Sequence, residues 1–180
     1  MTEETVRLKA EFDDVTTRIR DLLARIDDAT LQRRPRDASW SAAECVEHLS
    51  VTAEKYARRI ERAIETGDRR PANGAGRHTL WGRFWLWLLG SRRKLNAPPP
   101  FEPKSSPDRD ALLTHFDASH TALTKLVEET DAFDRTCIKV QSPSSKYIRL
   151  SILDAFAILA SHGRRHAVQA EQAARIIPPA

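Results

Sequence analysis

The stretch Ser41–Ile64, SAAECVEHLSVTAEKYARRIERAI, decides the fold class because its pattern is typical of one long amphipathic helix. It opens with Ser41-Ala-Ala-Glu44, a capping-box pattern in which the Ser41 hydroxyl accepts a hydrogen bond from the backbone N–H of Glu44. Gly67 is a suitable end for this helix. Its apolar stripe recurs every three or four residues, at Val46, Leu49, Ala53, Tyr56, Ile60 and Ile64.

The same spacing predicts three further helices. The first covers roughly 3–28, the third starts at Ser106-Pro107, and the fourth starts at Ser151 and ends before Pro178. No window has the alternation of a half-buried strand, although 136–141 can form a short extended piece. The sequence therefore predicts an all-α protein with a four-helix bundle.

The lengths of the connections restrict the topology of this bundle. A helix of 25 residues is about 37 Å long. About 40 residues separate the second and third helices, which is enough to cross that distance, so these two helices can run parallel. The other connections, of about 12 and 20 residues, suit neighbouring helices. We expect an up-down-down-up bundle.

Length and composition indicate one folded domain over residues 1–180. Hydrophobic residues make up 41% of the 180 and charged residues 30%, which excludes a wholly disordered chain, and the six glycines exclude collagen-like order. No apolar run is long enough to span a membrane, and the N-terminus does not resemble a signal peptide. The two cysteines, Cys45 and Cys137, do not form a CxxC pair. A reducing, cytoplasmic location is the expectation.

The segment 68–106 between the second and third helices differs from the rest of the chain. It carries eight Lys or Arg against two acids, so it is +6 while the remainder is −2. It also contains three of the four tryptophans, in the apolar run Leu80–Leu89, and His78, for which the sequence offers no partner. The aromatic side chains can cap one end of the bundle, form a dimer contact, act as a lid over a pocket, or anchor the chain at a membrane surface.

Three histidines are candidates for a metal site. His162 and His166 are four residues apart, so both imidazoles lie on one face of the fourth helix. An HxxxH pair also arises by chance, with one histidine at the edge of the core and the other in solvent. His48 lies at the edge of the stripe of the second helix, so the three can meet in a groove between the two helices. Three imidazoles suit Zn²⁺, Ni²⁺ or Fe²⁺ and leave coordination positions open for water or substrate.

Two stretches together resemble the DinB/YfiT-like superfamily of metal-dependent enzymes. They are Trp40–Leu49, WSAAECVEHL, and His162–Gln169, HGRRHAVQ. The resemblance extends over nearly the whole chain except 68–106. It implies an up-down-down-up bundle and a metal held by His48, His162 and His166. Several members of the family are transferases or isomerases that use a low-molecular-weight thiol.

Other reactive side chains have simpler interpretations. Cys45 is expected to be a buried structural thiol. Arg164 and Arg165 either bind an anionic substrate or are solvated charges on the flank of the helix. His115 and His120 fall on opposite edges of the third helix, so we do not expect them to act as a pair.

The leading hypothesis is a metal-dependent S-transferase or hydrolase that attacks a small electrophilic molecule. The alternative is a non-catalytic bundle that uses the aromatic and basic insertion for a dimer contact or a membrane surface. The positive net charge of +4 alone suggests nucleic-acid binding, but no recognition helix or stacking motif supports a specific nucleic-acid partner.

Overall fold

The computed structural model describes residues 1–36, 39–72, 76–91, 97–103 and 107–175. Four long helices make up most of it: α1 (Glu3–Arg25), α3 (Ala42–Thr66), α5 (Arg109–Glu129) and α6 (Ile152–Arg175). The shorter elements are α2 (Asp28–Gln32), α4 (Leu80–Gly90), the 3₁₀ turn η1 (Pro99–Phe101), and the strands β1 (Lys139–Gln141) and β2 (Arg149–Ser151).

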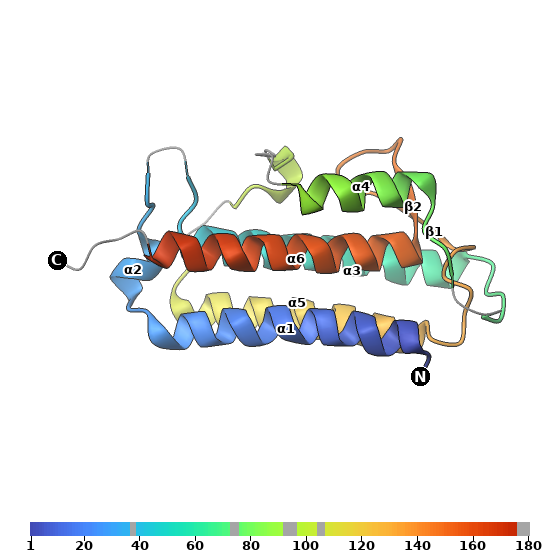
Figure 1. The fold of residues 1–180 in the computed structure, drawn as a ribbon, viewed down its shortest axis with the longest axis horizontal. Coiled ribbons are helices and arrows are strands. Elements are labelled where there is room, and N and C mark those ends of the chain that lie inside the picture. Colours follow the sequence, from blue (N-terminus) through green and yellow to red (C-terminus); the bar gives the residue numbers. More distant parts are fainter. Residues whose placement is uncertain (37–38, 73–75, 92–96, 104–106, 176–180) are drawn as a thin grey trace.

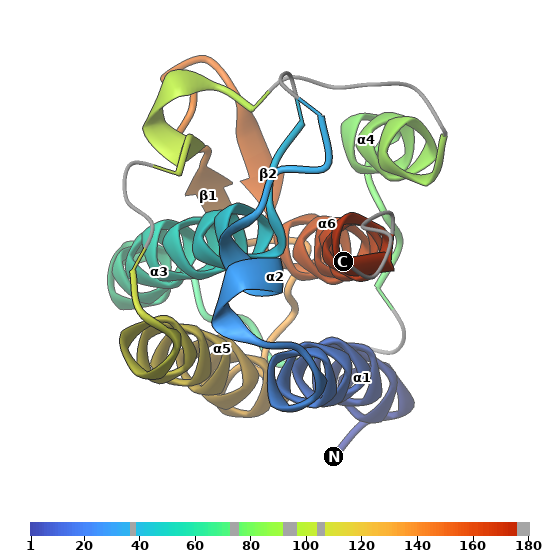
Figure 2. The same cartoon turned by 90° about the vertical axis from the view of Figure 1, so that its left-hand side faces the viewer.

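The four long helices form the predicted bundle. Seen end-on, α3 and α6 lie in one layer and α5 and α1 in the other, with α3 against α5 and α6 against α1 (Figure 2). Followed along the chain in Figure 1, α1 and α6 run in one direction and α3 and α5 in the other. The topology is therefore up-down-down-up, as the 40-residue connection between α3 and α5 indicated.

Each long helix buries the stripe that its spacing predicted. In α1 the buried side chains are Leu8, Phe12, Val15, Ile19 and Leu23, three or four residues apart. In α6 the stripe includes Gly163, where an added Cβ would lie only 3.2 Å from the Val15 side chain. That close approach explains the small residue at this position, because α1 and α6 pack against each other there.

The ends of the helices differ in two places from the expectation. The first helix ends at Arg25 rather than near residue 28, because the side chain of Asp27 accepts a hydrogen bond from the Thr30 N–H and starts the separate short helix α2. Helix α5 is capped by Asp108, whose carboxylate accepts from the Ala111 N–H at 2.8 Å. The expected cap, Ser106, lies outside the described residues. At α3 the capping box of Ser41 and Glu44 and the end at Gly67 are as predicted.

The insertion contains a helix that the sequence pattern did not reveal. Helix α4 lies along the flank of α6, outside the four-helix layers (Figures 1 and 2). The expectation that its aromatic residues cap one end of the bundle is therefore wrong. An almost continuous apolar run has no periodicity, so the sequence could not show that it forms a helix or which side it buries.

A two-stranded hairpin completes the fold beside α3. Strand β1 falls within the predicted extended piece 136–141, and it pairs in antiparallel register with β2, which the sequence did not suggest. Val140 and Leu150 face each other across the hairpin and are both buried. None of the helices in the described part of the chain is both long enough and apolar enough to cross a bilayer.

Candidate metal centre

His48 is held in place by the first two turns of α3. The capping box at Ser41 and Glu44 fixes the start of this helix, and the Arg34 side chain donates two hydrogen bonds to the Glu44 carboxylate. Together these contacts lower the pKa of Glu44, although burial works in the opposite direction. Glu44 is thus a capping residue, and it positions the helix that carries His48 one turn further on.

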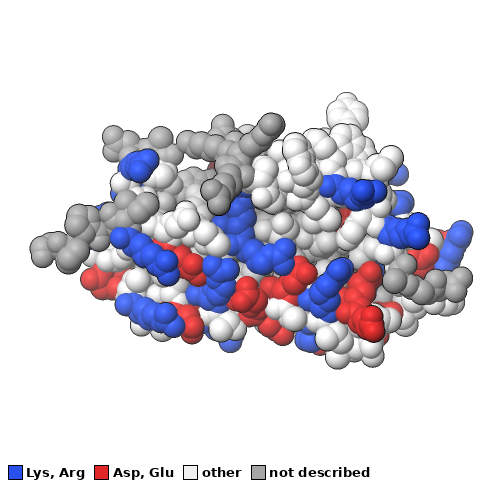
Figure 3. All heavy atoms as spheres, in the orientation of Figure 1, with Lys and Arg blue, Asp and Glu red and all other residues white. Residues whose placement is uncertain are grey.

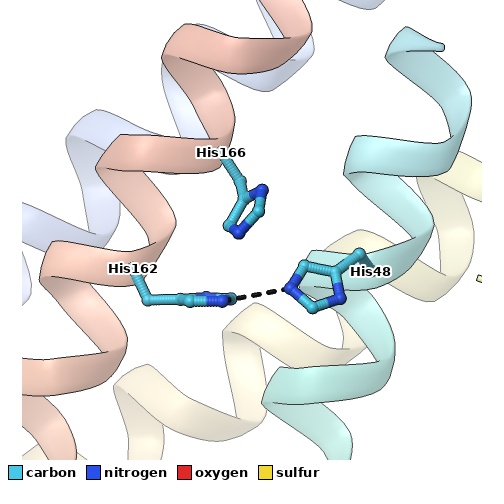
Figure 4. Close-up of side chains that lie close together, drawn as sticks. All are labelled: His48, His162 and His166. Carbon is cyan, nitrogen blue, oxygen red and sulfur yellow. Dashed lines mark hydrogen bonds between the residues drawn. The ribbon is translucent and has the colours of Figure 1, made fainter. Parts of the chain in front are cut away.

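His162 and His166 project from α6 toward His48 on α3 (Figure 4). One ligand atom from each of the three histidines can be chosen so that all three lie within 4.8 Å of one another. His48 Nε2 lies 3.0 Å from His162 Nε2. Trp40 flanks the group, with its ring centroid 4.8 Å from that of His48 and 5.8 Å from that of His166. The structure therefore brings together the three residues that the sequence selected.

The backbone of the insertion orients His48. His48 Nδ1 lies 2.6 Å from the carbonyl oxygen of Phe101, at the end of η1. A carbonyl can only accept, so Nδ1 carries the proton and donates it, which leaves the lone pair on Nε2 directed toward His162. A ligating histidine is commonly oriented by such a contact on its other nitrogen. Nothing in the sequence marked Phe101 for this role, because the contact is made by its backbone.

Burial keeps all three imidazoles neutral. It lowers the pKa of His48, which is only 2% exposed, against a small opposing effect of the Phe101 carbonyl. Burial and the nearby His166 and His48 lower the pKa of His162 well below the usual value. Burial, followed by the fields of His48 and Arg165, lowers the pKa of His166 to about 3. Neutral imidazole is the form of histidine that binds a metal.

The donor set fits a divalent transition metal. His166 Nδ1 is buried and has no hydrogen-bond partner among the described residues, and such a nitrogen is costly unless something binds it. Two nitrogens that each bind zinc at about 2.0–2.1 Å with a tetrahedral angle lie about 3.3 Å apart. The 3.0 Å between the nitrogens of His48 and His162 is close to that value. Three neutral imidazoles suit Zn²⁺, Ni²⁺ and Fe²⁺.

The histidines form part of the wall of a cavity of about 320 Å³ between α3, α6, α4 and the hairpin. This volume lies at the lower end of the range for small-molecule sites. The described lining contains no Asp or Glu, and most of it is apolar: Trp85, Leu88, Leu89, Phe101, Ile148, Leu150, Ile158 and Leu159 among others. Helix α4 thus forms a side wall of the cavity. Of the roles considered for the insertion, this is nearest to a lid over a pocket.

The two arginines beside the histidines have structural partners. Arg164 pairs with Glu11 on α1 at 2.7 Å. Arg165 donates to the carbonyl oxygens of Leu89 and Ser91 and so holds the end of α4 against α6, although it also borders the cavity. The interpretation of both as solvated flank charges missed these contacts, because the partners lie on other elements.

The remaining histidines are not among the three converging imidazoles, although His120 is close enough to His162 to help lower its pKa. His115 contacts Glu47 and Glu54 on α3, whereas His120 is buried against Phe116. His78 does have a partner, the fully buried Asp154 of α6, whose Oδ1 lies 2.9 Å from His78 Nδ1.

Cys45 is buried as expected, and burial raises the pKa of its thiol to about 12. At neutral pH this thiol is therefore protonated, and in the first turn of α3 it behaves as a small apolar side chain that faces the core.

Comparison with known proteins supports the fold and identifies the family. None of the curated proteins searched matches the sequence. Among solved structures, YfiT from Bacillus subtilis is similar, with 15% sequence identity and a TM-score of 0.64, over 97% of this chain and 89% of that one. YfiT is described as a probable metal-dependent hydrolase with an unusual four-helix bundle topology. The family model of the DinB superfamily matches residues 11–170, most of the chain. This protein belongs to the DinB superfamily.

Proposed function

We propose that this protein is a metal-dependent enzyme that acts on a small molecule in the 320 Å³ cavity, with His48, His162 and His166 as the protein ligands. The observation that carries the proposal is the convergence of three neutral imidazoles, one buried and two half-buried, on one side of a largely apolar cavity. A similar bundle, YfiT, is described as a probable metal-dependent hydrolase, which supports the same class of chemistry.

The metal, Zn²⁺, Ni²⁺ or Fe²⁺, would supply Lewis acidity and would lower the pKa of a bound water or thiol. The chain contributes the rest. The Phe101 carbonyl holds the proton of His48 on Nδ1, and Trp40 and the apolar side chains around the histidines exclude bulk water. An apolar surrounding strengthens every electrostatic interaction inside the cavity.

Hydrolysis of an activated electrophile is the reaction we favour, with transfer to a low-molecular-weight thiol as the second option. The described lining contains no carboxylate that could act as a general acid, which favours substrates whose leaving group departs without protonation. Substrates with a good leaving group, such as 4-nitrophenyl esters, are therefore the first compounds to screen, with and without an added thiol.

The metal content of the purified protein tests the assignment. We expect about one transition-metal ion per chain in the parent and less than about a tenth of that in His48→Ala and His162→Ala, because loss of one of three ligands removes most of the affinity. His115→Ala is the matched control. It also removes a histidine, but this one pairs with Glu47 and Glu54 and is not part of the three-histidine group.

Two results would contradict the assignment. The first is a parent that binds none of Zn²⁺, Ni²⁺ or Fe²⁺ after reconstitution. The second is metal retained by both variants while circular dichroism shows the native helix content.

A second candidate function rests on the outer face of α4. Leu80, Trp81 and Trp87 are 83%, 62% and 59% exposed, so this helix presents aromatic side chains to solvent as well as to the cavity. Exposed Arg77 and Arg83 lie in the same stretch, and the sequence has no acid between 69 and 101. Exposed tryptophans with neighbouring arginines suit the interface of an anionic membrane. We propose this surface as a site of membrane contact.

Flotation with vesicles tests this second proposal. The parent should float with vesicles that contain anionic phosphatidylserine, and Trp81→Ser/Trp87→Ser should lose at least about tenfold in partitioning. Equal flotation of the two proteins would contradict it. Self-association of the parent, measured by analytical ultracentrifugation and abolished by the same double substitution, would instead assign the face to a homodimer.

A further inference from the structure

The cavity extends well beyond the histidines along α3. His48, Thr52 and Tyr56 follow one another at intervals of four residues on one face of this helix, and all three line the cavity. Eight residues of helix correspond to about 12 Å. The hairpin contributes Ser142 and Ser144 near Tyr56, so hydroxyl groups gather at the end of the cavity away from the metal ligands.

These hydroxyls leave a hydrogen-bond donor unused. The Tyr56 hydroxyl oxygen lies 3.2 Å from Ser142 Oγ, which in turn lies 2.8 Å from Ser144 Oγ. Three hydroxyl groups joined by two hydrogen bonds have three protons, and two bonds use at most two of them. Ser142 Oγ also accepts from the Ser144 N–H at 3.3 Å. Whatever the direction of the two hydrogen bonds, one of the three O–H groups has no acceptor among these hydroxyls.

Thr52 adds a second donor. Its hydroxyl is buried and has no hydrogen-bond partner among the described residues, although a threonine in a helix often donates to the carbonyl four residues before it. Ser50 and Thr124 do make that bond, to Val46 and His120. A buried hydroxyl without a partner is destabilising. Its presence next to a cavity indicates that an occupant of the cavity completes it.

Among the described residues that line the cavity, no ionised side chain accompanies these hydroxyls. The cavity residues around them are Phe101, Ile148 and Leu150, and Arg165 lies at the other end, one residue before His166. An anion at the hydroxyl end would be desolvated without a countercharge, which is costly. A neutral acceptor, such as the oxygen of a ketone, ester or amide, satisfies the free donors without that cost.

We infer that the cavity binds an elongated, uncharged and largely apolar small molecule, whose carbonyl-type oxygen is held by the hydroxyls of Thr52, Tyr56, Ser142 and Ser144. Its length is about 12 Å, the distance along α3 from Tyr56 to His48, and Thr52 lies between them, one helical turn from each. The placement of its reacting end at the histidines rests on the proposed function, whereas binding at the hydroxyl end does not require the metal.

Binding of 2-nonanone to the metal-free, full-length protein tests this inference. Trp40 and Trp85 line the cavity, so tryptophan fluorescence reports its occupation. We expect saturable binding that is at least about tenfold tighter than binding of nonanoate, which has the same chain length and a negative charge. Equal or tighter binding of nonanoate would overturn the inference.

Two substitutions identify the donors. Thr52→Val keeps the shape of the side chain and should weaken binding of 2-nonanone about fivefold, the value of one hydrogen bond. The same variant should unfold at a higher temperature than the parent in the absence of ligand, because the unpartnered hydroxyl is gone. Tyr56→Phe/Ser144→Ala should weaken binding to a similar extent. Tyr147→Phe, which removes a tyrosine hydroxyl from an exposed side chain outside the cavity, should change neither quantity.

The outcomes separate this inference from the proposed function. Binding of 2-nonanone that is weakened by Thr52→Val supports the inference even if the protein never takes up metal. A protein that binds metal through the three histidines but shows no saturable binding of 2-nonanone overturns it and leaves the metal centre in place. Unchanged affinity in both cavity variants also overturns it.

Discussion

The bundle helices and helix α4 are both rich in apolar residues, but they are positioned in different ways. Each bundle helix has one apolar stripe and one charged face, so burial of the stripe fixes its rotation. Helix α4 has a single charged residue, Arg83, among its 11 residues and exposes apolar side chains on its outer side. Figure 3 shows the contrast: Lys, Arg, Asp and Glu crowd the surface over α1, whereas few lie over α4.

Specific polar contacts at its two ends therefore add to the packing of Trp85, Leu86 and Leu89 on the core and set the orientation of α4. The buried carboxylate of Asp154 accepts hydrogen bonds from the Thr79 hydroxyl at 2.7 Å and from the Thr79 N–H at 3.3 Å, at the start of α4. Arg165 holds the other end through the carbonyls of Leu89 and Ser91. Hydrophobic burial is non-directional, so these few hydrogen bonds fix how α4 is oriented on α6.

The largest effect is expected at Gly82, where α4 touches this carboxylate. A Cβ at position 82 would lie 2.0 Å from Asp154 Oδ1, and Asp154 is fully buried and cannot move aside. Gly82→Ala should separate α4 from α6. We expect a loss of about 3 kcal/mol in the free energy of unfolding, measured with urea, and loss of hydrogen-exchange protection in Leu80–Gly90.

Gly90→Ala is the matched control for this substitution. Nothing lies within 4 Å of a Cβ built at Gly90, so the free energy of unfolding should change by less than about 0.5 kcal/mol. If the Gly82 variant keeps α4 as protected as in the parent, the contact with Asp154 does not position the helix.

A smaller effect is expected inside the bundle, where protonation of His120 makes the free energy of unfolding depend on pH. Burial lowers the pKa of this imidazole to about 4, against opposing effects of the Phe116 carbonyl and Asp117. The unfolded chain binds the proton near pH 6.5 and the folded chain does not, so the stability present above pH 6.5 is lost as the pH falls toward 4. His120→Leu should remove this loss, which amounts to about 2 kcal/mol between pH 7 and pH 4.5.

Urea denaturation of the parent and His120→Leu at pH 7, 5.5 and 4.5 measures the difference. His162 is present in both proteins, and burial, the first cause of its lowered pKa, acts in both, so its contribution to the two profiles largely cancels. Parallel profiles would show that His120 takes up its proton without unfolding the bundle.

The fold and the positions of the three histidines were accessible from the sequence because both depend on periodicity. Spacing of three and four residues gave the buried stripe of each long helix, and the spacing of four between His162 and His166 placed both imidazoles on one face. The long connection between α3 and α5 then gave the topology. Each of these inferences uses residues that are close in sequence.

What the sequence could not reveal depends on contacts between distant segments. The Phe101 carbonyl that orients His48 is a backbone group, and any residue at that position could supply it. The pairing of His78 with Asp154 joins residues 76 positions apart. The Thr52 hydroxyl has no hydrogen-bond partner among the described residues, and this depends on which segments pack around it. Side-chain type and spacing carry no signal for any of the three.

The parallel arrangement of α3 and α5 has a consequence for how such proteins diversify. The chain must return along the whole bundle between these helices, about 37 Å, so a long crossover is obligatory. Here that crossover supplies one wall of the cavity and the carbonyl that orients His48. Exchange of the crossover between related chains would then change which molecules enter, while the three histidines, carried by α3 and α6, stay in place.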